Sequence, residues 1–132
     1  MPIRILSPLP DATERVVQTV IGAAIEVHKA LGPGLLESIY ADAMAIELEF
    51  KNIRHERQKS VLLTYRERPL RSQRIDLVVE DQVLVELKAT ERLQPVHHAQ
   101  VISYLRASGL RVGLLLNFNS HLLRESIRRI VL

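Results

Sequence analysis

Two neighbouring apolar runs decide the fold of this chain: Ile75-Asp76-Leu77-Val78-Val79 and Val83-Leu84-Val85-Glu86-Leu87-Lys88-Ala89. Only Glu80-Asp81-Gln82 separates them, so the spacing predicts a tight connection between two antiparallel strands. Because side chains alternate along a strand, Leu84, Glu86 and Lys88 are expected on one face of the sheet. Val83, Val85, Leu87 and Ala89 are then expected on the other face. The pattern therefore puts charged residues inside strands that are otherwise apolar.

Asp76, Glu86 and Lys88 form the candidate chemical centre. Charges inside an apolar strand are costly to bury unless they are paired or used, and a hairpin of this length could bring Asp76 near Glu86. Two close carboxylates repel each other, which favours a shared proton or a divalent cation, and hard oxygen ligands suit Mg²⁺ or Mn²⁺. Lys88 could then orient a metal-bound water or stabilise a phosphorane-like transition state. The alternative is a buried carboxylate–lysine pair that only fixes the strand register.

The sequence before this pair predicts two helices and one further strand. Helical spacing continues up to Leu31, where Gly32-Pro33-Gly34 ends the first helix, and Asp11 with Glu14 has the spacing of a capping box. A second helix runs from about Leu36 to Lys51 and carries Ile39, Ala43, Ile46 and Phe50 on one side. Alternation of Val61, Leu63 and Tyr65 predicts a strand, with a turn at residues 66–69 before the next strand at about 71–79.

The sequence after the pair predicts a helix and a buried strand. Pro95 opens a helix that reaches Ser108, and Gly109 ends it. The continuous apolar run Val112–Leu116 suits a strand buried on both faces. Residues 127–132 are either a short final strand or a packed extension. The order α-α-β-β-β-α-β with a tail predicts an α/β fold, a single sheet flanked by helices.

Length and composition restrict the class of protein. A chain of 132 residues with 47% hydrophobic residues fits one domain, with an extended, proline-rich lead over residues 1–10. The absence of cysteine excludes disulfides, thiolate metal sites and a cysteine nucleophile. Neither a signal peptide nor an apolar run of membrane-spanning length is recognisable, so a cytoplasmic protein without a membrane partner is expected.

Positive charge gathers between Arg54 and Arg74. The bases and acids of this segment are Arg54, Arg57, Lys59, Arg66, Arg68, Arg71 and Arg74 against Glu56 and Glu67. The local charge is +5 (7 − 2), which leaves −2 for the rest of the chain (3 − 5). Any surface that faces a polyanion is therefore expected here. The alternative is a solvated edge hairpin that its charges keep monomeric.

Two further polar groups lie on helices. Glu37 and Tyr40 are three residues apart and share a face of the second helix. His97, Gln100 and Tyr104 make a polar stripe on the third helix, which could hydrogen-bond the carboxylates or a phosphate. For each group an ordinary helix surface is the alternative, and for His97 alone it is the preferred one. His28 is expected to be a partly buried histidine satisfied by a backbone carbonyl.

These groups together resemble a known family. Gly34-Leu35-Leu36-Glu37-Ser38-Ile39-Tyr40 matches the GxxExxY signature, and Asp76 with Glu86-Leu87-Lys88 matches a D…ExK core. Gln100-Val101-Ile102-Ser103-Tyr104 fits the QxxxY motif of RecB-like nucleases. The chain thus resembles the GxxExxY proteins, a bacterial and archaeal group placed in the PD-(D/E)xK nuclease superfamily, over about residues 20–132.

The resemblance implies an αβββαβ core of the restriction-endonuclease type with a central mixed sheet. It implies that Asp76, Glu86, the backbone carbonyl of Leu87 and Glu37 bind Mg²⁺ or Mn²⁺. Lys88 would position the attacking water, and Gln100 and Tyr104 would orient the site or contact DNA. The implied activity is hydrolysis of DNA phosphodiester bonds by metal-activated water.

A second function remains open beside the nuclease. The chain could be a catalytically silent nucleic-acid-binding or assembly module that keeps the fold for stability. So small a domain lacks the helicase or lid elements that guide larger relatives. Self-association or a partner protein is therefore expected to complete a DNA groove.

Overall fold

The fold is that of a computed structural model, which describes residues 8–132. Along the chain the elements are α1 (Asp11–Leu31), α2 (Glu37–Phe50), β1 (His55–Tyr65), β2 (Arg68–Val79), β3 (Val83–Lys88), α3 (Pro95–Ser108), β4 (Val112–Asn117), the short 3-10 helix η1 (Leu123–Ser126) and β5 (Ile127–Val131). The five strands form one sheet in the order β1-β2-β3-β4-β5. Neighbouring strands are antiparallel except β3 and β4, which are parallel. The predicted mixed α/β fold is confirmed.

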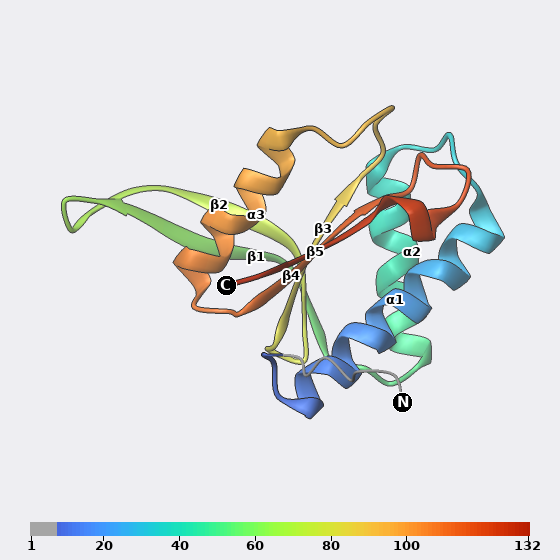
Figure 1. Cartoon of the computed structure of the whole chain (residues 1–132), viewed down its shortest axis with the longest axis horizontal. Coiled ribbons are helices and arrows are strands. Elements are labelled where there is room, and N and C mark those ends of the chain that lie inside the picture. The colour runs from blue at the N-terminus through green and yellow to red at the C-terminus, as the bar shows by residue number, and fades with distance from the viewer. Residues whose placement is uncertain (1–7) are drawn as a thin grey trace, which may run out of the picture.

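The helices cover the sheet on both faces, with α1 and α2 on one side and α3 on the other (Figure 1). Val83, Val85 and Leu87 join the hydrophobic cluster under α1 and α2. Leu84 belongs to the second cluster, with Val101 of α3. The predicted alternation of β3 is therefore confirmed, and β3 is a central strand buried on both faces.

Helix α3 explains why β4 runs parallel to β3, because a strand that follows a crossover helix re-enters the sheet in the same direction. The helix packs closely on β4, since a Cβ added at Gly113 would lie 2.6 Å from Cγ1 of Val101. The tail forms a true strand, β5, paired antiparallel with β4. This resolves the alternative that the sequence left open, and it buries β4 completely.

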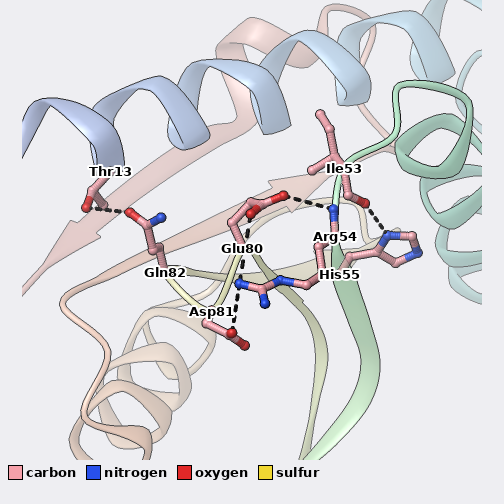
Figure 2. A network of polar contacts seen from close by, with 7 residues as sticks. All are labelled: Thr13, Ile53, Arg54, His55, Glu80, Asp81 and Gln82. Carbon is pink, nitrogen blue, oxygen red and sulfur yellow. Dashed lines mark hydrogen bonds and ion pairs between the residues drawn. The ribbon is translucent and has the colours of Figure 1, made fainter.

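A polar network fixes the turn between β2 and β3 (Figure 2). Glu80 and Asp81 both have positive φ, which tight hairpin turns of this kind require. The Glu80 carboxylate accepts a hydrogen bond of 2.9 Å from the Arg54 backbone N–H, and the Arg54 guanidinium lies 3.0 Å from the Asp81 carboxylate. The Thr13 hydroxyl of α1 donates to Gln82 at 2.8 Å. These contacts tie α1 and the start of β1 to the turn.

Two predicted element boundaries and one predicted helix cap were wrong. The first strand begins at His55, well before Val61, because its first residues are polar and alternate too weakly to signal a strand. The turn is formed by Arg66 and Glu67, both with positive φ, while Arg68 already belongs to β2. No capping box exists at the start of α1.

The failed capping box has a simple cause in the position of the helix start. Pro10 is the N-cap residue and Asp11 the first helical residue, without a capping side chain. The Glu14 side chain pairs with Arg129 of β5 instead. The spacing was therefore right for a box, but the chain enters the helix one residue too early for it.

Most of the apolar side predicted for α2 faces solvent, although Ala43 packs against the core. Ile46 is 66% exposed and Phe50 82% exposed, whereas Tyr40, Met44 and Leu48 are fully buried. Both rows repeat at helical spacing, so periodicity alone does not distinguish them. The row that packs against the sheet is chosen by the tertiary structure.

Residues 1–7 of the predicted extended lead lie outside the described residues, so that prediction applies here only to residues 8–10. Among residues 8–132, every helix is too short or too polar to cross a bilayer.

Candidate functional site

The site begins where β2 separates from β3. Their ladder of paired residues stops at Leu77 and Val85. Beyond it the Asp76 backbone N–H donates to Oε1 of Glu86 at 3.0 Å, and the Leu87 backbone N–H donates to Oδ2 of Asp76 at 2.8 Å. The two carboxylates thus accept hydrogen bonds that backbone carbonyls would otherwise take. The hairpin brings Asp76 and Glu86 together, as the sequence indicated.

The course of β2 changes at the same point. Ile75 packs in the cluster under α3, whereas Leu77, two residues later, packs in the cluster under α1 and α2. Residues two apart in a regular strand share one face, so the strand is irregular at Asp76. On the other side Gln58 of β1 has a positive φ of 51°. The backbone is therefore irregular at Asp76 in β2 and at Gln58 in the neighbouring strand β1.

Burial makes Glu86 an unusual carboxyl group. Its side chain is only 4% exposed. Burial, followed by the negative charge of Asp76, raises the pKa of Glu86 to about 8, against the lowering effects of the Asp76 backbone N–H and the Lys88 ammonium. At neutral pH the pair therefore holds a proton, which a cation could replace.

Lys88 and Glu37 lie within electrostatic reach of the Asp76–Glu86 pair. The Lys88 ammonium opposes the rise in the pKa of both Glu37 and Glu86, so its charge reaches both carboxyl groups. Glu37 is the first residue of α2, and burial, with a further contribution from Asp76, raises its pKa. No three Asp, Glu or His side chains of the described residues gather closely enough to hold a metal ion. Glu37 therefore acts on the pair at longer range.

Helix α3 contributes Tyr104 and Gln100 to the same region. The Gln100 side-chain amide donates to the Tyr104 hydroxyl at 3.0 Å. Burial and then the charge of Glu86 raise the pKa of Tyr104, which places this hydroxyl within electrostatic reach of the carboxylates. His97 does not take part, because its Nδ1 atom accepts a hydrogen bond of 2.9 Å from the Gln94 backbone N–H and caps α3.

The tyrosine of the GxxExxY segment has a structural environment. The Tyr40 hydroxyl donates to the Gly32 carbonyl at 2.5 Å and accepts from the Leu35 backbone N–H at 3.2 Å. Its ring stacks on Phe118 with centroids 4.6 Å apart. Tyr40 thus holds the turn before α2 and fixes where Glu37 begins that helix.

His28 is buried, and its Nε2 atom lies 2.8 Å from the Ser120 backbone carbonyl. This confirms the prediction of a helix histidine satisfied by a backbone carbonyl.

Sequence reasoning missed two residues that support the site. Asn117, 3% exposed at the end of β4, donates to the Thr90 carbonyl at 2.9 Å and accepts from the Thr90 N–H at 3.1 Å. It thereby holds the segment that follows Lys88, and its polarity directly after an apolar run was a usable signal. Gln58 reaches Oδ1 of Asp76 at 3.5 Å, and nothing in its local sequence marks it.

The donor set fits a hard divalent cation. Asp76 and Glu86 supply carboxylate oxygens, the ligands that such ions prefer. Leu87 adds a third: the N–H and C=O of one residue in a strand point to the same side, and its N–H points at Asp76. With the neighbouring Glu37, the described site holds more negative than positive charge. Such a set could accommodate a divalent cation in place of the shared proton.

Comparison with known proteins agrees with this geometry. The model of the PD-(D/E)XK nuclease superfamily matches residues 14–130, a range that includes all five strands except the last residue of β5 and all three helices except the first turn of α1. No curated protein and no solved structure gives a significant match to the chain. A match over this share of the sequence settles the family: the chain belongs to the PD-(D/E)XK nuclease superfamily.

Proposed function

We propose that this protein is a nuclease that hydrolyses phosphodiester bonds of DNA and depends on Mg²⁺ or Mn²⁺. The observation that carries the proposal is the Asp76–Glu86 pair, held at the end of the β2–β3 ladder with Lys88 beside it. Nucleases of this superfamily generally use divalent ions, and the pair offers the oxygen ligands that they require.

Asp76, Glu86 and the Leu87 carbonyl would hold the cation, with Glu37 acting through an intervening water because it lies outside the direct cluster. A bound divalent cation supplies Lewis-acid activation of water and neutralises charge on the phosphate. Lys88 would orient the attacking water or donate to the phosphate as negative charge develops. Tyr104, with its acceptor position taken by Gln100, would donate its hydroxyl proton toward Glu86 or a phosphate oxygen.

The sequence signature supports a narrower placement, among the GxxExxY proteins near the RecB-like branch. The segment from Gly34 to Tyr40 has two separate tasks here: Tyr40 stabilises the turn, and Glu37 lies within electrostatic reach of the site. The expectation of self-association or a partner protein stays a prediction.

The test is calorimetric titration of Mg²⁺ and Mn²⁺ into the wild-type protein and Asp76→Ala, followed by incubation with plasmid, linear DNA, single-stranded DNA and RNA. We expect metal binding that Asp76→Ala removes and DNA cleavage that Lys88→Ala abolishes. Lys29→Ala, which changes an exposed lysine on α1, is the matched control and should cleave normally. Absence of metal binding at millimolar concentration, together with no Lys88-dependent cleavage, would overturn the nuclease proposal. DNA binding without cleavage would favour the catalytically silent module.

A further inference from the structure

The basic segment divides into two parts with different surroundings. Three of its bases are paired with acids: Arg54 with Asp81 at 3.0 Å, Arg57 with Asp42 at 2.6 Å, and Lys59 with Glu56 at 3.9 Å. Much of their charge is therefore offset locally. This half of the segment, next to the helices and the β2–β3 turn, is a weak candidate for binding a polyanion.

The other part is the distal arm, which we define as residues 62–74, the end of β1 and the start of β2. It holds Arg66, Arg68, Arg71 and Arg74 against one acid, Glu67, so its net charge is +3 (4 − 1). All four arginines are exposed, and within residues 8–132 none of them forms an ion pair with an acid. The positive charge of the segment is concentrated in this arm.

The distal arm projects from the sheet (Figure 1). β2 pairs with β3 only from Leu77 to Val79, so its earlier residues pair with β1 alone. The arm begins two residues before Asp76, at Arg74. A polyanion bound along the arm would therefore reach the carboxylate pair.

The arm also exposes apolar side chains beside its arginines. Tyr65 at the tip is 65% exposed, and Leu62 and Leu70 are 52% and 55% exposed. The Arg66 guanidinium lies 5.9 Å from the centre of the Tyr65 ring, so a cation and an aromatic face stand together at the tip. The arm therefore combines unpaired positive charge with exposed apolar side chains.

Nucleic acid with unpaired bases matches both properties. Arginines bind phosphates wherever they occur, whereas aromatic and apolar side chains gain contacts only where base faces are open. A continuous duplex hides those faces inside its stack. An acidic protein would satisfy the arginines but offers no general partner for the exposed ring.

We propose that the distal arm binds nucleic acid that carries unpaired bases, such as a single strand or the overhang of a duplex, with its arginines on phosphates and Tyr65 stacked on a base. One part of this inference rests on the proposed function: that the bound nucleic acid is the substrate of the nuclease site. Binding itself requires neither the cation nor cleavage.

The experiment measures fluorescence anisotropy of labelled DNA with the full chain in EDTA, so that cleavage does not enter. The probes share one sequence as a single strand, a blunt duplex and a duplex with a single-stranded overhang. Tyr65→Ala should weaken binding of the single strand and the overhang about tenfold and leave the blunt duplex unchanged. Tyr65→Phe, which keeps the ring, should bind like the wild type.

The arginines are tested by their salt dependence. Arg71→Gln combined with Arg74→Gln should weaken all probes and reduce the slope of log affinity against log salt by roughly 1.4 for the single strand and roughly 1.8 for the blunt duplex. Arg124→Gln, an exposed arginine of η1, is the matched control. All changed residues are exposed, and a thermal melt of each variant verifies folding.

Equal affinity of the wild type for all three probes, or an unchanged affinity in Tyr65→Ala, would overturn the preference for unpaired bases. An unchanged salt slope in the arginine variant would show that the arm is not part of the binding surface. If no probe binds, the proposal fails in favour of an acidic protein partner. Tight, Tyr65-dependent binding without cleavage after Mg²⁺ is added would retain this inference while the nuclease proposal fails.

Discussion

Oδ2 of Asp76 accepts a hydrogen bond of 2.8 Å from the backbone N–H of Leu87, in the place where a carbonyl of a neighbouring strand would normally serve. The side chain therefore has two tasks, one in the sheet and one in the proposed cation site. These tasks can be separated by substitution.

Asp76→Asn retains an oxygen acceptor for the Leu87 N–H but loses the charge, whereas Asp76→Ala loses both. We expect Asp76→Ala to lower the free energy of unfolding by about 1–3 kcal/mol and Asp76→Asn to change it by less than about 1 kcal/mol. Both should lose cation binding. Urea unfolding with calorimetric titration tests this, and normal Mn²⁺ affinity in Asp76→Asn would contradict it.

Glu86 makes the stability of the cation-free protein depend on pH. The folded protein holds a proton with a pKa of about 8, while the unfolded chain releases it near its ordinary value of 4.5. The stabilising contribution is therefore complete below pH 4.5 and lost as the pH rises through about 8, by roughly 1 kcal/mol per pH unit between these values. Urea unfolding in EDTA across this range measures the slope.

In Glu86→Gln this component of the pH dependence should disappear, because the amide does not titrate. Glu49→Gln, which changes an exposed carboxylate on α2, should keep the wild-type slope. A wild-type slope in Glu86→Gln would show that another group binds the proton.

Cation binding should release this proton. Between about pH 6 and about 8 the apparent affinity for Mn²⁺ should rise by up to about tenfold per pH unit, and it should level off above the pKa of Glu86. Calorimetry in buffers of different ionisation enthalpy counts the protons released. Affinity that is constant over the whole range would contradict a cation ligand with a raised pKa.

Tyr40→Phe should damage the fold rather than the chemistry. It removes the hydroxyl that joins the Gly32 carbonyl and the Leu35 N–H, at an expected cost of about 1–3 kcal/mol in the free energy of unfolding. Tyr65→Phe changes an exposed tyrosine and should cost less than about 0.5 kcal/mol. At temperatures where Tyr40→Phe remains folded, its Mn²⁺ affinity should fall only slightly, because the loosened turn carries Glu37 and leaves Asp76 and Glu86 in place. A large loss of affinity there would give Tyr40 a direct role in the site.

Gly113→Ala should push α3 away from the sheet, because its Cβ would lie 2.6 Å from Cγ1 of Val101. We expect a loss of about 1–3 kcal/mol in the free energy of unfolding. Val101→Ala removes the clashing methyl group, so the double variant should be more stable than the sum of the two losses predicts. Strict additivity in a cycle of urea unfolding experiments would contradict the close contact.

The sequence by itself determined the strands around Asp76 and Glu86, the alternation of β3 and the limits of α3. These features follow from repeats of 2 and 3.6 residues and from glycine and proline signals, all of which act over a few neighbouring positions. The same local patterns placed a carboxylate on each strand of one hairpin. The two carboxylates are therefore brought close together by the turn that joins their strands.

Only the tertiary structure decided which side of α2 is buried and which arginines remain unpaired. Arg57 is neutralised by Asp42 from α2, and Arg54 by Asp81 from the next turn, contacts that no local pattern contains. Arg71 and Arg74 resemble them in sequence, but on the projecting arm neither forms an ion pair within residues 8–132. Desolvation of Glu86 likewise depends on everything packed around β3. Charge pairing and burial are set by residues distant in the chain, which is why they appear only once it is folded.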